Sequence, residues 1–121
     1  MKALVCLIAV LCTTLVWAKQ RGSLVQQAPT YVSEQRNPYA GSHDAMRAGS
    51  KIYSRQCAGC HGRDASGMGK APPLSSPLVR KAPEGALFWV LRNGSAFHGM
   101  PSFARLPDEQ LWQIVTYLKS L

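Results

Sequence analysis

The chain has 121 residues, of which 46% are hydrophobic, and its 14 Lys and Arg against 6 Asp and Glu give a formal net charge of +8. This length allows one domain plus a targeting segment. The basic residues are scattered, with no run longer than Arg80-Lys81, and aromatic residues do not interleave with them. We therefore expect no nucleic-acid groove, and an acidic protein partner accounts better for the charge.

Residues 1–18 predict a cleaved secretory signal peptide. After Met1 and Lys2, the apolar run of residues 3–17 is shorter than the roughly 20 residues that a membrane-spanning helix needs. Ala18 closes the run where a signal peptidase would cleave. Cleavage predicts an exported, periplasmic location. The alternative is an uncleaved anchor, with Trp17 at the membrane interface, and only that case predicts membrane association.

Residues 19–40 are predicted to be an extended tether. They are rich in Gln, Ser, Asn and Pro, and they follow neither a helical nor a strand period. The alternative is that they wrap around the domain, because they include apolar side chains such as Tyr31 and Val32. The folded domain is then residues 41–121.

Three helices are predicted in this domain, and no segment predicts a convincing strand, so the fold class is all-α. The first helix covers about residues 44–56, where apolar or small side chains recur with helical spacing. The second begins near Pro83 and ends at Asn93-Gly94, as proline at a helix start and glycine after its end indicate. The third begins near Asp108, an acid that suits a helix N-terminus.

The most informative residues are Cys57-Ala58-Gly59-Cys60-His61, at the end of the first helix. Cys-x-x-Cys-His is the attachment motif of haem c. Each thiol adds to one vinyl group of the porphyrin, and the histidine binds the iron. One covalent haem c is therefore the predicted cofactor, and its apolar face would complete the thin core of so small a domain.

Two other uses of the cysteine pair remain as alternatives. A zinc site usually needs four protein ligands, but the chain has no second cysteine pair downstream, and its other histidines are His43 and His98. A redox dithiol would require a βαβ context, which the pattern around Cys57 lacks.

Met100, in the segment Phe97-His98-Gly99-Met100-Pro101, is the predicted sixth ligand of the iron. Ligation by His61 and Met100 would fill both axial positions and raise the reduction potential, which favours electron transfer over catalysis at the metal.

Three other side chains are rival ligands to Met100. Met68 lies in the loop after the motif, Met46 lies on the first helix, and His98 could replace Met100 under alkaline or denaturing conditions.

From about residue 44 to residue 121 the chain resembles small class I cytochromes c of bacteria, in their exported mono-haem form. The likeness rests on Gly49 and Tyr53, on the haem motif, on Pro72-Pro73-Leu74 and on Gly99-Met100-Pro101. It implies a small class I cytochrome c fold, with three main helices and loops wrapped around one haem. It also implies that Gly49 lets the C-terminal helix approach closely and that Tyr117 meets the first helix there.

The resemblance implies further roles around the haem. The carbonyl of Pro72, or alternatively of Pro73, would accept a hydrogen bond from His61 Nδ1, and Leu74 would pack against the haem. The 39-residue distance from His61 to Met100 is short for the larger eukaryotic members, so their propionate contacts do not carry over. Trp89 and Arg92 are our predicted propionate partners, because both can donate hydrogen bonds to carboxylates. Alternatively, Trp89 is a core residue and Arg92 is solvated.

These features predict a one-electron carrier between exported respiratory or dehydrogenase partners, and not an enzyme. The first alternative is a haem c subunit held permanently in a periplasmic dehydrogenase or oxidase complex. The second is a weak haem peroxidase, which would need the open sixth position that Met100 is expected to fill.

Overall fold

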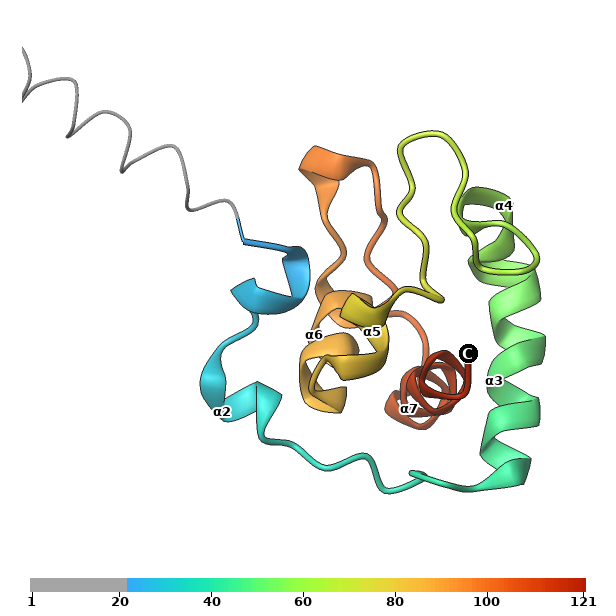
Figure 1. Cartoon of the computed structure of the whole chain (residues 1–121). Helices are drawn as coiled ribbons and strands as arrows, with labels where there is room; N and C mark the ends of the chain where they lie inside the picture. Colours follow the sequence, from blue (N-terminus) through green and yellow to red (C-terminus); the bar gives the residue numbers. More distant parts are fainter. Residues whose placement is uncertain (1–21) are drawn as a thin grey trace, which may run out of the picture.

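The structure is a computed structural model, and it describes residues 22–121. The predicted signal peptide lies outside the described residues. The elements are η1 (Leu24–Gln27), α2 (Thr30–Ser33), α3 (His43–Gln56), α4 (Ala58–His61), α5 (Pro77–Lys81), α6 (Glu84–Asn93), η2 (Ala96–His98) and α7 (Asp108–Lys119) (Figure 1). In this part of the chain the only strand-like pairings are two isolated bridges. The all-α class is confirmed.

The three predicted helices correspond to α3, α6 and α7. Ser42 caps α3, because its Oγ accepts the N–H of Ala45 at 3.2 Å. Pro83 precedes α6, and Gly94 ends it with φ +65°. The short helices α4 and α5, which have too few turns to show a period, were not predicted. Among residues 22–121, no helix has the length and apolar character needed to cross a membrane.

Helices α3 and α7 make the most extensive helix pair of the domain. Gly49 is the point of closest approach: a Cβ atom added there would lie 2.0 Å from the carbonyl oxygen of Gln113 and 3.0 Å from Cβ of Tyr117. One turn further along α3, the Tyr53 ring meets the Tyr117 ring with 5.2 Å between their centroids. The roles expected of Gly49 and Tyr117 are therefore confirmed.

The core lies between α3, α6 and α7. Its largest fully buried side chains are Tyr53 on α3 and Leu111, Ile114 and Val115 on α7. Helix α6 adds Phe88, whose ring stacks on Trp112 with a centroid distance of 4.2 Å. The apolar faces of these helices thus pack against one another.

Residues 22–42 form a strap that packs against α6 and α7, where the sequence predicted an extended tether. Both η1 and α2 contact α6. Gly85 of α6 permits this contact, because a Cβ there would lie 2.0 Å from the Val32 carbonyl oxygen. Val32 itself is buried. The alternative of a segment wrapped around the domain therefore describes these residues better.

A buried amide fixes the end of the strap. The Asn37 side chain donates to the hydroxyl of Thr116 on α7 at 2.9 Å, and it accepts from the N–H of Tyr39 at 2.9 Å. The Thr116 hydroxyl lies 3.0 Å from the carbonyl oxygen of Trp112. Buried polar groups that are satisfied in this way hold one specific arrangement.

We expect Gly49→Ala to destabilise the holo-protein, because the new methyl group would push α7 away from α3. The loss should be at least about 2 kcal/mol in the free energy of unfolding, the usual size of an overpacking penalty. Guanidinium unfolding followed by circular dichroism measures it. Gly59→Ala is the control, since nothing lies within 4 Å of a Cβ at Gly59. Equal stability of the two variants would contradict the close packing at Gly49.

Candidate functional site

The Cys57–His61 motif lies where α3 ends and α4 begins. Cys57 closes α3, with its N–H donating to the Tyr53 carbonyl at 2.8 Å, and its own carbonyl accepts from the His61 N–H at 2.9 Å. This sharp turn buries the Cys57 and His61 side chains and leaves Cys60 exposed. Both cysteines are free thiols. The motif therefore presents two unpaired thiols and one buried imidazole within five residues.

The two thiols differ in their surroundings. Burial, followed by the nearby charge of Cys60, raises the pKa of the Cys57 thiol to about 11. In the folded chain without a cofactor, Cys57 is thus protonated at neutral pH and poorly reactive.

The His61 ring is held by the hydrogen bond that the resemblance implied. Its Nδ1 lies 2.9 Å from the carbonyl oxygen of Pro72. A carbonyl oxygen only accepts, so Nδ1 bears the proton and Nε2 keeps a free lone pair. Such a partner fixes both the tautomer and the orientation of a metal-binding imidazole.

Tyr53 connects α3 to the residue after His61. Its buried hydroxyl donates to the Gly62 carbonyl at 2.7 Å. Burial is the main cause that raises the pKa of Tyr53 to about 12, followed by the nearby Cys57. The phenol therefore stays protonated, and keeps donating this hydrogen bond, throughout the physiological pH range.

The loop of residues 62–76 brings Pro72 back to His61. Ala65, fully buried at its centre with φ +60°, accepts the Leu74 N–H on its carbonyl at 2.8 Å. Leu74 is partly buried and packs against the core. A left-handed backbone at a non-glycine residue persists only where its surroundings enforce it, so this loop has a defined shape.

Met100 lies in a hairpin loop, residues 94–102. Its N–H donates to the Ser95 carbonyl at 3.0 Å, and its carbonyl accepts the Ser95 N–H at 2.8 Å. Gly94 is needed at the start of the loop, since a Cβ there would lie 2.5 Å from the carbonyl carbon of Pro101. Met100 is half-buried and packs against the core.

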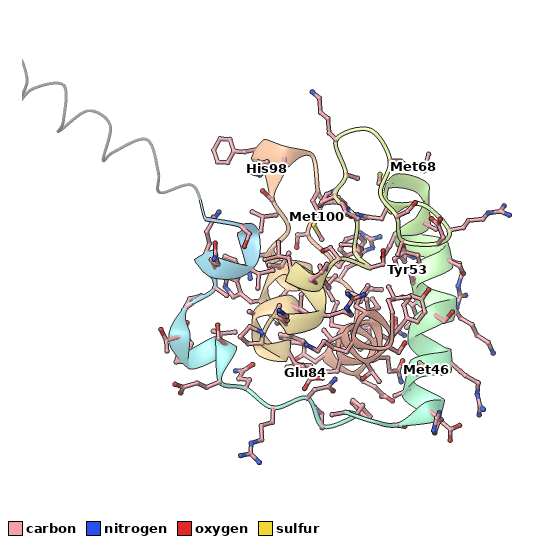
Figure 2. The ribbon with its side chains drawn as sticks, viewed as in Figure 1. Met46, Tyr53, Met68, Glu84, His98 and Met100 are labelled. Carbon is pink, nitrogen blue, oxygen red and sulfur yellow. The ribbon has the colours of Figure 1, made fainter. Side chains whose placement is uncertain are left out.

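The rival ligands occupy different places (Figure 2). Met46 lies toward the start of α3, far along the helix from α4. Met68 is 57% exposed in the loop of residues 62–76. His98 is exposed, and its Nδ1 lies 2.7 Å from Ser95 Oγ. Of these side chains, Met100 is the sulfur donor that is half-buried and packs on the core.

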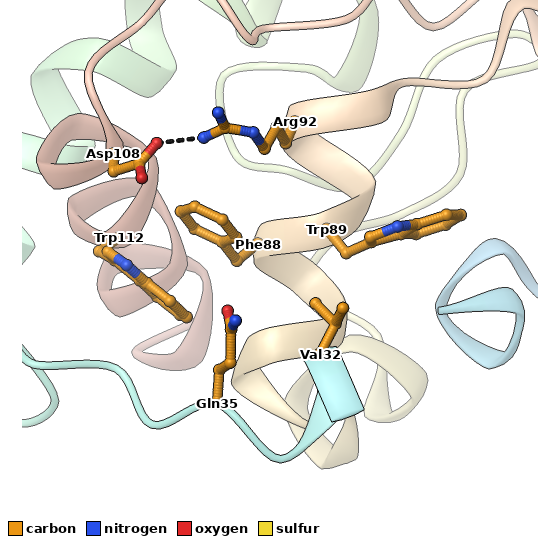
Figure 3. A pocket seen from close by; sticks show the side chains of 7 residues that line it. All are labelled: Val32, Gln35, Phe88, Trp89, Arg92, Asp108 and Trp112. Carbon is orange, nitrogen blue, oxygen red and sulfur yellow. Dashed lines mark hydrogen bonds and ion pairs between the residues drawn. The ribbon is translucent and has the colours of Figure 1, made fainter. Parts of the chain in front are cut away.

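The two predicted propionate partners line a pocket of about 300 Å³ between α2, α6 and α7 (Figure 3). Arg92 forms an ion pair there with Asp108, and both side chains are largely exposed. The Trp89 ring points away from this pair, toward η1 (Figure 3). The structure thus gives Arg92 a carboxylate partner within the protein, and the propionate roles of Trp89 and Arg92 stay predictions.

Sequence reasoning missed Ser95, which pairs with both the backbone of Met100 and the ring of His98. The available signal was the pair of glycines, Gly94 and Gly99, that bracket this short segment. Glycines at such spacing are typical of a tight hairpin loop.

The donor set fits a covalently bound haem. Free thiols at Cys57 and Cys60 suit two thioether bonds, and the orientation of His61 leaves one ring nitrogen available to iron. An all-α domain with this motif defines a c-type cytochrome.

Comparison with known proteins supports the assignment to the c-type cytochromes. The family model described as "Cytochrome C oxidase, cbb3-type, subunit III" matches residues 44–118, and the chain belongs to this family of c-type cytochromes. It therefore carries covalently attached haem c.

Three curated relatives and one solved structure are similar to this chain. Cytochrome c550 of Pseudomonas aeruginosa is 37% identical over 92 residues, 71% of this chain and 62% of that protein. Quinohemoprotein alcohol dehydrogenase ADH-IIG of Pseudomonas putida is 34% identical over 83% of this chain and 14% of its own length. Subunit FixP of the cbb3-type cytochrome c oxidase of Rhizobium meliloti is 32% identical over 81% of this chain and 35% of its own length.

The chain therefore spans less than two thirds of each of these relatives. The crystal structure of cytochrome cL from Methylophaga aminisulfidivorans matches with a TM-score of 0.61 at 23% identity, over 84% of this chain and 70% of that one. This likeness confirms the cytochrome c fold.

We expect the attachment to depend on both thiols. Cys57→Ser should retain haem through one bond, with a shifted pyridine haemochrome spectrum, and the Cys57→Ser, Cys60→Ser double variant should release its haem into acidified organic solvent. Intact mass of the mature protein checks the number of bonds. Ala58→Ser, a change inside the motif that removes no thiol, is the control and should keep the wild-type spectrum. Haem that remains bound in the double variant would contradict this attachment.

Proposed function

We propose that this chain is an exported one-electron carrier in which His61 and Met100 are the axial ligands of a haem joined to Cys57 and Cys60. When bound, haem c supplies reversible one-electron chemistry at its iron. The residues of the chain attach the group, select the ligand atoms and limit the access of other molecules to the iron.

The observation that carries this proposal is the hydrogen bond between His61 Nδ1 and the Pro72 carbonyl, at 2.9 Å. It commits Nδ1 to a proton and leaves Nε2 for the metal. A histidine held only for stability would not need this arrangement beside two free thiols. The same hydrogen bond raises the basicity of the imidazole and keeps its ring from rotating.

The hairpin of residues 94–102 supports the role of Met100. Two reciprocal backbone hydrogen bonds with Ser95 and the packing of Met100 on the core restrict where its sulfur can lie. A thioether held by its own loop competes well with water for the sixth position. This argues against the peroxidase alternative, which requires an open position on the iron.

The charge distribution supports charge-steered partners. The ion pairs found within residues 22–121 are Arg47–Asp44 and Arg92–Asp108. Other exposed basic residues have no carboxylate partner in that part of the chain, among them Lys51, Arg55, Lys70, Arg80, Lys81 and Arg105. Unpaired surface charge raises the rate of encounter with an acidic protein. We propose an exported dehydrogenase as donor and a terminal oxidase, or a carrier leading to one, as acceptor.

The alternative is a haem c subunit held in such a complex. The names of two relatives favour it, since one is an oxidase subunit and the other a dehydrogenase that contains this domain in a small part of its length. Both readings assign the same chemistry to His61 and Met100, and they differ in whether the partner is bound permanently.

We expect Met100→Ala to open the sixth position. The weak sulfur-to-iron absorption band of the ferric protein should disappear, the reduction potential should fall, and peroxidase activity should appear as the iron becomes accessible. Met68→Ala is the matched control, because it removes the same side chain from a neighbouring loop. The reverse result, with Met68→Ala active as a peroxidase and Met100→Ala unchanged, would assign the ligand to Met68.

We also expect electron transfer to an acidic partner to slow steeply as salt rises. The screening length falls from about 30 Å at 0.01 M to about 8 Å at physiological ionic strength, which weakens steering by unpaired surface charges. The measurement is the second-order rate constant between roughly 10 mM and 500 mM salt, the range over which screening changes most. A flat profile would favour the permanently bound subunit.

A further inference from the structure

Phe97 is the most exposed large apolar side chain of the described residues. It belongs to η2, three residues before Met100, and its neighbours Ala96 and Pro101 are also exposed. Single exposed apolar residues are ordinary on protein surfaces. Here, however, the exposed ring lies in the same short loop as the half-buried Met100.

The loop that presents Phe97 is well fixed. Besides the two Ser95–Met100 backbone bonds, the His98 N–H donates to the Ser95 carbonyl at 3.0 Å, and the Ser95 hydroxyl lies 2.7 Å from His98 Nδ1. The loop base is tied to α6, since Ser102 Oγ donates to the Arg92 carbonyl at 2.6 Å. A loop whose backbone is fixed before binding loses little backbone freedom when a partner covers it.

The segments nearest to Phe97 lack acidic residues. Residues 94–107 contain no Asp or Glu and include Arg105, and residues 65–71, around Met68, contain no acid and include Lys70. Figure 2 places Met68, from the second of these segments, at the same end of the molecule as His98. Met68 is exposed as well. An apolar centre with basic surroundings complements an apolar hollow rimmed by carboxylates.

We propose that Phe97 is the apolar anchor of the docking surface for a redox protein, inserting into a hollow beside that partner's own cofactor. This inference rests on the function proposed above and adds the residue that selects the partner. An interface usually depends on a few such anchors, with aromatic residues prominent among them. The position of Phe97 beside the proposed sixth ligand favours a redox protein over a lipid surface or a second copy of this chain.

The test uses the full-length holo-protein and washed membranes of the organism that makes this chain, with oxygen consumption measured against the concentration of reduced protein. Phe97→Ala should lower kcat/KM about tenfold, mainly through KM, as expected for the loss of an interface anchor. Phe97→Leu should retain most of the rate. Tyr31→Ala is the matched control, since Tyr31 is an exposed aromatic residue on the strap, outside this surface.

Four further measurements separate the outcomes. The reduction potential and the rate of oxidation by ferricyanide, which needs no docking surface, should be the same in all variants. If these change with Phe97→Ala, or if its rate with membranes equals that of the wild type, the anchor role is overturned. Loss of sedimentation with acidic lipid vesicles, or loss of a dimer in sedimentation velocity, as the sole effect of Phe97→Ala would assign the ring to a lipid or to a second copy instead. Wild-type protein that transfers no electrons to the membranes would overturn the proposed function itself.

Discussion

The close approach of α3 and α7 at Gly49 is the contact on which the rest of the domain depends. Cys57 directly follows helix α3 as its C-cap, so the angle and depth at which α3 meets α7 decide where the thiols and the imidazole face. Only a residue without a Cβ lets the Gln113 carbonyl lie against α3. Tyr53, one turn later, makes two contacts: its ring packs against Tyr117, and its hydroxyl donates to the Gly62 carbonyl.

Around this helix pair, the site is organised mainly by backbone groups. Three of its groups are hydrogen-bonded to backbone carbonyls. His61 bonds to Pro72, the Tyr53 hydroxyl to Gly62, and the Met100 N–H to Ser95. Main-chain partners of this kind do not rotate, so they restrict the orientation of the groups they hold. Such rigidity suits a reaction in which an electron moves and no bond to the protein is made or broken. It also explains why loops with little regular structure can define the site.

The parts of the protein that the sequence predicted well are those whose signal is local. The cysteine spacing follows from the geometry of two thioether bonds, and α3, α6 and α7 each bury an apolar stripe with the period of a helix. The strap was predicted only as the alternative to a tether, because its buried residues, Val32 and Asn37, are single positions whose partners lie far away in the sequence. The propionate roles of Trp89 and Arg92 stay predictions; the pairing of Arg92 with Asp108 depends on a residue 16 positions away, which no local pattern reveals.

The strap has a consequence for reach. As an extended chain, residues 22–40 would provide roughly 60 Å of length, enough for a tethered domain to travel between distant partners. Packed against α6 and locked to Thr116, the same residues provide almost none. If residue 22 itself were held by a membrane or a larger assembly, this domain would therefore stay close to that attachment point. In that case partners would have to come to the domain.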